Sequence, residues 1–198
     1  MNRFESFPDR AITLSGSISM EFLRLGINRF HQACRWVQEL PYGYNTNRDD
    51  IMVLFKERKG SCTTKHAVIA TLARELGLSI RKYIGIYPMT DDLVTGSGEL
   101  LARFELPYLP MVHCFLGDGT HRVDLTEGNR NGKNHSIEEF LYVQRVEPNI
   151  SAKDEYLLYR QALKAQILTR PEWHGIEMKS ILQARQEGLE LLRKVLLS

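Results

Sequence analysis

The chain has 198 residues, of which 43% are hydrophobic and 25% are charged. This balance is typical of a folded globular protein, and a chain of this length forms one domain or one domain with an extension. The formal net charge is only +2, from 26 basic and 24 acidic residues, and the sequence contains no dense basic block. The charge pattern therefore argues against a nucleic-acid partner.

Cys34, Cys62 and Cys114 are an odd number of cysteines, which favours free thiols in a reducing compartment over a disulfide framework. The first residues include acidic side chains and Pro8, where a signal peptide requires an apolar run. No stretch approaches the ~18 consecutive apolar residues of a membrane-spanning helix. We therefore expect a cytoplasmic protein with no membrane contact.

The N-terminal part of the sequence has a helical pattern. Apolar residues recur at helical spacing after Ser17 or Ser19, either of which could cap a helix that runs to about Leu40. Proline and glycine within residues 41–45 stop this helix. A short apolar stretch at residues 51–55 predicts a further helical turn or two, which a basic, glycine-ended loop follows.

A second helix is expected over residues 63–76, where small and aliphatic side chains form one stripe. Gly77 stands where a left-handed C-terminal cap is needed. Because small residues occur all round this helix, we expect it to be deeply buried against a sheet or against other helices.

Three later segments predict strands, because they are rich in β-branched and aromatic residues. They are residues 79–87, 111–116 and 120–125. The intervening residues 90–110 are expected to form a loop.

The C-terminal part returns to helical spacing from residue 151, and Pro171 divides it into two helices. We therefore predict an α+β fold with two parts. Residues 1–150 form a domain in which N-terminal helices pack on a small antiparallel sheet. Residues 151–198 form a helical extension packed on the same domain.

Cys62 follows Gly60 and Ser61 at the start of the small-residue helix. Unpaired N–H groups and the helix dipole stabilise an anion at such a place, which lowers the pKa of a cysteine from its free value of about 8.5. Gly60 also allows a substrate to approach the backbone closely. The position suits a nucleophile, although a lone cysteine at a helix start more often packs as a small hydrophobic residue.

A thiolate nucleophile needs a base, and the base needs a third group to orient it. His113 and Asp124 lie on two predicted strands that flank Asp118-Gly119, a favoured dipeptide for a two-residue type I′ turn. With this turn, His113 faces Asp124 directly across the hairpin, with Cβ atoms about 4.5–5.5 Å apart. The carboxylate would then bind one ring nitrogen and direct the other toward Cys62.

The order of these residues resembles that of a known family. Gly-Ser-Cys at residues 60–62 opens an alanine-containing helix, and His113 and Asp124 follow on successive strands, as in the transglutaminase-like superfamily with its papain-like Cys-His-Asp core. The resemblance covers roughly residues 35–126. It implies a transglutaminase-like, cysteine-proteinase fold for the domain.

The resemblance also implies a mechanism. Cys62 attacks a carboxamide or peptide carbonyl, His113 pairs with the thiolate and then protonates the leaving amine, and Asp124 holds the ring. The acyl group passes to water or to an amine, so the enzyme is a thiol hydrolase or an acyltransferase. The implied substrate is a peptide or protein amide, and the implied mechanism requires no metal and no cofactor.

The oxyanion hole is expected to include the backbone N–H of Cys62, with a side-chain donor from Tyr44, Tyr42 or Trp36. One departure from the family pattern follows the histidine. The family often has a small residue and then tryptophan there, whereas Cys-Phe occupies residues 114–115 in this chain, which alters the expected shape of the acyl site.

Two other classes of function fit parts of the sequence. A non-catalytic module could keep the fold and hold a peptide or protein in the groove between helix and hairpin. A metal-dependent hydrolase could draw its ligands from Cys62, His66, His113 or Cys114, although no Cys-x-x-Cys or His-x-x-x-His pair frames such a site.

Individual residues also have simpler interpretations. Asp124 could cap the turn that contains Thr126, and His113 could be an ordinary strand histidine. His66 lies on the same helical face as Cys62, four residues later, and is expected to have a structural role. Cys114 should point away from the site, into the core.

Overall fold

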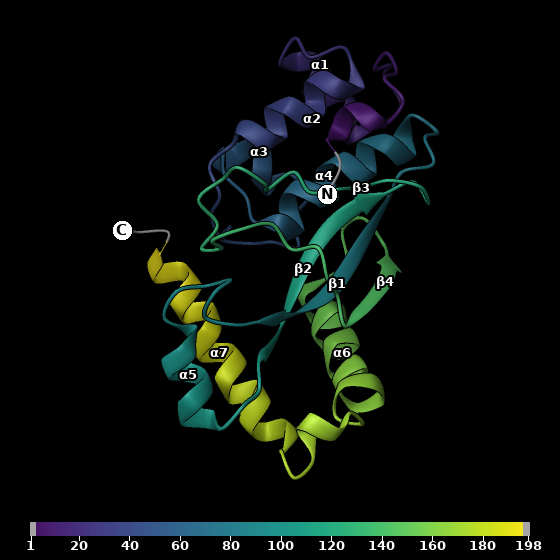
Figure 1. Cartoon of the computed structure of the whole chain (residues 1–198). Coiled ribbons are helices and arrows are strands. Elements are labelled where there is room, and N and C mark those ends of the chain that lie inside the picture. Colours follow the sequence, from purple (N-terminus) through teal and green to yellow (C-terminus); the bar gives the residue numbers. More distant parts are fainter. Residues whose placement is uncertain (1–2, 196–198) are drawn as a thin grey trace. The chain divides into compact units, whose positions relative to one another are not determined.

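The computed structural model describes residues 3–195. The described helices are α1 (Ser17–Arg24), α2 (Phe30–Glu39), α3 (Val53–Glu57), α4 (Cys62–Glu75), α5 (Ser97–Phe104), α6 (Ala152–Ala162) and α7 (Met178–Val195) (Figure 1). The strands are β1 (Arg81–Met89), β2 (Leu109–Gly117), β3 (Arg122–Val123) and β4 (Tyr142–Val146). The short turns are η1 (Phe4–Ser6), the π-helical η2 (Leu163–Ile167) and η3 (Pro171–Trp173). The predicted α+β class is confirmed.

The chain forms two compact units, and three of its strands have residues in both. The first unit comprises Met1–Ile84, Cys114–Asn129 and Gln144–Ser151, and the second comprises Gly85–His113, Arg130–Val143 and Ala152–Ser198. Strands β1, β2 and β4 each pass from one unit into the other. The last crossing follows Ser151. The expected division into residues 1–150 and 151–198 stays a prediction.

The strands form one antiparallel sheet in the order β3-β2-β1-β4. The predicted strands correspond to β1, β2 and β3, but the sequence did not indicate β4. All five side chains of β4 are half-buried or exposed, so this strand lacks the alternation of apolar and polar residues that marks a half-buried strand.

The hairpin between β2 and β3 has a different register from the one predicted. Leu116 pairs with Val123, so the connection is the four-residue loop 118–121 instead of a two-residue turn. Oδ1 of Asp118 accepts hydrogen bonds from the amides of Thr120 and His121, at 2.8 and 2.7 Å, and stabilises this longer loop.

The direct pairing of His113 with Asp124 was therefore wrong by two residues. A shift of two residues keeps each side chain on its expected sheet face, because side chains alternate with a period of two. Strand β3 ends at Val123, so Asp124 lies just beyond it.

The single helix predicted to run to Leu40 is two helices, α1 and α2. Gly26 follows α1 with a φ of +74°, which glycine adopts without steric strain. The amides of Gly26 and Ile27 donate to the carbonyls of Leu23 and Phe22, at 3.0 and 2.9 Å, and end the helix. The break was missed because both helices turn apolar residues toward the same core, which preserves the helical spacing.

Helix α4 is the central helix of the first unit, where it packs against α1, α2 and α3 (Figure 1). Every residue from Cys62 to Ala73 is buried, as the all-round pattern of small residues predicted. The amides of Gly77 and Leu78 donate to the carbonyls of Arg74 and Ala73, at 3.1 and 2.8 Å, which is the Schellman ending expected at this glycine. The helix begins at Cys62, one residue earlier than predicted.

In the second unit, residues 90–110 were predicted to be a loop but contain helix α5. Oδ1 of Asp91 accepts hydrogen bonds from the amides of Gly96 and Gly98, at 2.9 and 2.7 Å, at the start of this helix. Leu100 is buried in the core cluster of the unit, and α5 packs beside α7 (Figure 1). The two glycines obscured the helix in the sequence, because they favour a loop by composition.

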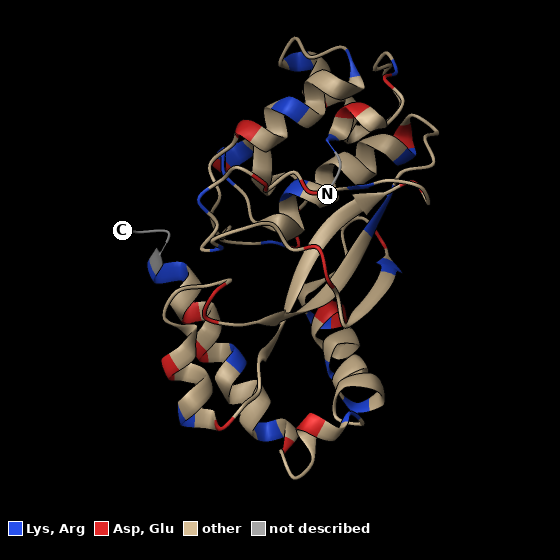
Figure 2. Cartoon of the chain, viewed as in Figure 1, with Lys and Arg blue, Asp and Glu red and all other residues tan. Residues whose placement is uncertain are grey.

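Charged residues of both signs are interspersed along the helices of each unit (Figure 2). Lys65 and Lys82 are completely buried in the first unit, which is rare for lysine. Among residues 3–195, no helix combines the length and the apolar character that crossing a bilayer requires.

Gly60 allows close packing just before α4, and we predict that Gly60→Ala lowers the free energy of unfolding by about 1–3 kcal/mol. A Cβ atom there would lie 2.4 Å from Cδ1 of the buried Leu54 and 2.7 Å from Oγ1 of Thr64. Gly43→Ala is the control, because its Cβ would meet only the flexible Lys59 side chain, at 3.2 Å. Urea denaturation measures both variants, and equal stabilities would contradict this account of Gly60.

Candidate active site

Cys62 is the first residue of α4 and keeps a small exposed area, 7% of the residue. Cys34 and Cys114 are completely buried, and burial raises the pKa of Cys34 well above its usual value. Ser61, the N-cap residue, makes no side-chain hydrogen bond to the helix. The positive end of the helix dipole is therefore directed at the most accessible of the three thiols.

The loop that precedes Cys62 lies against the segment that follows α2. Gly60 donates its amide to Pro41 O at 3.1 Å, and Gly43 donates its amide to Gly60 O at 3.3 Å, so Tyr42 forms a parallel bridge with Gly60. Tyr42 also contacts Tyr44 edge to face, with ring centroids 6.4 Å apart. Tyr42 and Tyr44, two of the predicted oxyanion candidates, thus lie on a segment whose backbone is hydrogen-bonded to Gly60, two residues before Cys62.

Trp36, the third oxyanion candidate, has a packing role. Its ring stacks on Phe55 with centroids 5.5 Å apart, and Phe22 meets it edge to face at 5.7 Å. The Arg58 guanidinium lies over the ring, 5.3 Å from its centroid. These contacts hold the indole against the core of the first unit.

Asp124 is buried, and its hydrogen bonds suit an ionised carboxylate. Oδ1 accepts bonds from the amide and the hydroxyl of Thr126, at 2.8 and 2.5 Å. Asp124 therefore does cap the turn at Thr126, as one of the simpler interpretations proposed. Two donors on one oxygen fix the direction of the carboxylate as well as favouring its charge.

His66 is the residue whose connecting role sequence reasoning missed. The ring is fully buried, with Nδ1 2.7 Å from Cys62 O and Nε2 2.8 Å from the amide nitrogen of Leu125. Nε2 also lies 3.5 Å from Oδ1 of Asp124. Its spacing from Cys62 was noted in the sequence, but no local pattern indicates its contact with Leu125.

Lys65 places a buried cation near Asp124. Its Nζ donates to the carbonyls of Leu40 and Gln38, at 2.6 and 3.1 Å. Burial lowers the pKa of Lys65 from 10.5 to about 8, and the attraction of the Asp124 carboxylate opposes that change. Lysine and aspartate thus favour each other's charged form.

His113 lies on β2 in the second unit and is buried. Its ring meets Tyr87 edge to face, with centroids 6.4 Å apart. His113 is the residue at which β2 leaves the second unit, and the next residue, Cys114, lies in the first unit with its sulfur 3.7 Å from the Thr63 hydroxyl. Cys114 is therefore a core residue, as expected, whereas the catalytic role of His113 stays a prediction.

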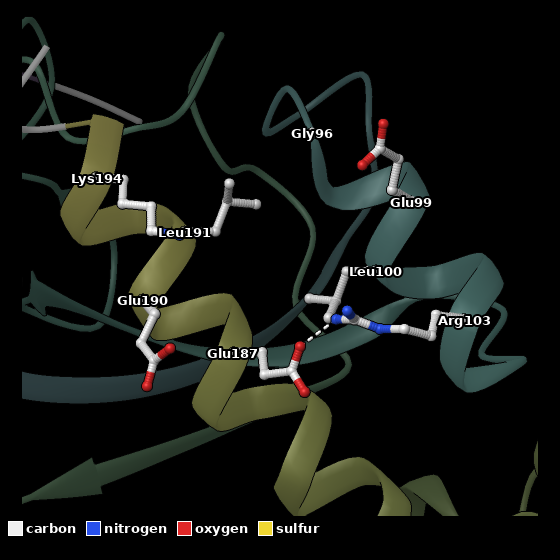
Figure 3. A pocket seen from close by; sticks show the side chains of 8 residues that line it. All are labelled: Gly96, Glu99, Leu100, Arg103, Glu187, Glu190, Leu191 and Lys194. Atoms are coloured by element: carbon white, nitrogen blue, oxygen red, sulfur yellow. Dashed lines mark hydrogen bonds and ion pairs between the residues drawn. The ribbon is translucent and has the colours of Figure 1, made fainter.

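Two of the hollows on the described part of the chain open on the second unit. One, of about 540 Å³, is lined by Tyr87, whose ring contacts His113, together with Pro88, Thr90, Asp92, Leu93 and residues 135–139. The other, of about 270 Å³, lies between α5 and α7 (Figure 3). Figure 3 shows an ion pair between Arg103 and Glu187 across it.

The metal-dependent alternative has little support around α4. Both ring nitrogens of His66 are bonded to backbone groups, so neither is available as a ligand. Within residues 3–195, no three His, Cys, Asp or Glu side chains are grouped as a metal site would require.

Comparison with protein families shows that the model of the transglutaminase-like superfamily matches residues 24–147. The chain belongs to the transglutaminase-like superfamily. The match contains Cys62, His113 and Asp124, and it confirms the resemblance and the fold inferred from them. Comparison with curated proteins and with solved structures finds no significant match. Members of the transglutaminase-like superfamily are typically cysteine-dependent hydrolases or acyltransferases.

We predict that Lys65 makes stability rise with pH between about 8 and 10.5. In this range the unfolded chain holds the lysine proton and the folded protein releases it, so the unfolded state binds more protons. The difference in unfolding free energy between the wild type and Lys65→Met should grow by up to about 3 kcal/mol.

Urea denaturation at a series of pH values measures this difference. Lys153→Met provides the control, because it removes an exposed lysine. A difference for Lys65→Met that is constant across the window would contradict the buried-cation account.

Proposed function

We propose that the protein is a cysteine-dependent amide or peptide hydrolase, or an acyltransferase, with Cys62 as nucleophile, His113 as base and acid, and Asp124 as the group that orients His113. The observation that carries this proposal is the position of Cys62 as the first residue of a buried helix, linked through His66 to the segment of Asp124. Membership of the superfamily supports the same chemistry.

In the first half of the reaction, the Cys62 thiolate attacks the carbonyl carbon of an amide. The tetrahedral oxyanion collapses, the carbon–nitrogen bond breaks, and the proton held by His113 passes to the leaving amine. Asp124 stabilises the imidazolium and fixes its tautomer, as the third member of such a triad does. The product of this half-reaction is a thioester on Cys62.

In the second half, water or an amine attacks the thioester while His113 takes its proton, and the thiolate leaves. The backbone N–H of Cys62 is the proposed oxyanion donor. Tyr42 and Tyr44 are the proposed side-chain donors in preference to Trp36, because their segment is bonded to Gly60 whereas the indole is held in the core. The proposed substrate is a peptide or protein amide.

Alkylation of Cys62 by iodoacetamide tests the proposal without a known substrate. A thiolate stabilised by His113 and the helix dipole should react below pH 7, with an inflection at least about one unit below the free-thiol value of about 8.5. His113→Ala should move the inflection back toward that value. Peptide mapping by mass spectrometry assigns the adduct, and the two fully buried cysteines should stay unlabelled.

A wild-type Cys62 that reacts as an ordinary thiol, with no change in His113→Ala, would sink the proposal. That result would favour a non-catalytic module of the same fold. Cys62→Ala is the control for the adduct assignment, because the protein should then take up no label.

A further inference from the structure

The two hydrogen bonds of His66 determine its protonation. The carbonyl oxygen of Cys62 can only accept, so Nδ1 must carry the proton. The amide of Leu125 can only donate, so Nε2 must present its lone pair. His66 is therefore a neutral imidazole with its proton on Nδ1, and both nitrogens are fully committed.

This assignment excludes the chemistry usually expected of a histidine beside a cysteine. His66 cannot act as base for the Cys62 thiol, because its unprotonated nitrogen already accepts the Leu125 amide. Its 3.5 Å approach to Oδ1 of Asp124 is no hydrogen bond either, since neither atom carries a proton in this state. The burial of the ring keeps water from replacing either partner.

The bonds instead join the two parts of the proposed triad that lie in the first unit. Nδ1 of the ring is hydrogen-bonded to the backbone carbonyl of Cys62, the residue that carries the thiol. Nε2 accepts the Leu125 amide, which belongs to the peptide bond between Asp124 and Leu125, so this bond fixes that peptide group. Thr126 fixes the Asp124 carboxylate, so His66 and Thr126 together fix the backbone and the side chain of the aspartate.

We infer that His66 is a positioning residue, which sets the place of Asp124 relative to Cys62 through its bond to the Leu125 amide. The inference rests on the proposed function, because Asp124 matters to reactivity only if it orients His113. A rigid ring suits this role, because it holds a donor and an acceptor at a fixed separation. A flexible side chain would lose conformational entropy on adopting the same geometry.

Two substitutions separate the two bonds. In His66→Asn, the side-chain amide nitrogen can take the place of Nδ1 and donate to Cys62, but nothing accepts the Leu125 amide. In His66→Gln, the longer side chain can present its oxygen to Leu125. Val68→Ala is the matched control, because Val68 is buried on the same helix and its truncation destabilises α4 without touching Asp124.

The measurement is the pH profile of Cys62 alkylation by iodoacetamide. His66→Asn should move the inflection upward, and the rate at low pH should fall about tenfold for each unit of that movement, because only the thiolate reacts. His66→Gln should stay close to the wild type. Val68→Ala should melt at a lower temperature with its inflection unchanged.

A double-mutant cycle with Asp124→Asn tests whether His66 changes the reactivity of Cys62 through Asp124. If His66 acts through Asp124, then His66→Asn should add nothing to the low-pH rate loss once Asp124 is asparagine. Additive losses would overturn the inference, because they would show that His66 acts on Cys62 by another path.

The remaining outcomes separate the inference from the proposed function. A wild-type inflection that depends on His113 but is unchanged in His66→Asn overturns the positioning role alone. A wild-type profile independent of His113 overturns both. A shifted inflection that also appears in Val68→Ala overturns the inference, because loss of stability would then explain it.

Discussion

The hydrogen bond from Nδ1 of His66 to the carbonyl of Cys62, together with the bond from the Leu125 amide to Nε2, is the constraint on which the candidate site depends. It joins the first turn of α4 to the segment that follows β3. A hydrogen bond between buried groups adds only about 1 kcal/mol, but leaving one partner unsatisfied costs more. The arrangement is therefore specific, because alternatives that separate these segments leave buried polar groups unpaired.

Two buried lysines extend the same principle around α4. Lys65 donates to the carbonyls of Leu40 and Gln38, and Lys82 donates to those of Thr63 and Pro148, at 3.0 and 3.1 Å. A buried ammonium group is costly unless it is fully hydrogen-bonded. These contacts thus tie the end of α2 and the chain after β4 to the helix that carries Cys62.

Much of the fold was predictable because it depends on local patterns. The small residues of α4 predicted a buried helix, and Gly77 predicted its ending, since both signals act within a few residues. The break at Gly26 was missed because a single glycine left the apolar spacing intact. Helix α5 was missed because the glycines at its start favour a loop by composition, and because Asp91, which accepts their amides, lies several residues upstream.

The superfamily was predictable from the sequence, and the geometry of the candidate site was less so. The order of Cys62, His113 and Asp124 indicated the superfamily. The hairpin register depended on side-chain bonds of Asp118, which the turn dipeptide alone does not reveal. The link from His66 to Leu125 depends on tertiary packing between segments far apart in the sequence, so no periodicity or spacing could indicate it.

We propose that Cys62 is an acyl-accepting nucleophile served by His113 and Asp124. The most direct measurement is capture of the acyl-enzyme. The protein is incubated with a peptide-based acyl electrophile and the adduct is mapped by mass spectrometry. The account predicts a single adduct on Cys62, formed at a rate that Asp124→Asn lowers by at least about tenfold. Labelling spread over surface nucleophiles, or an adduct on Cys62 that forms equally fast in Asp124→Asn, would contradict it.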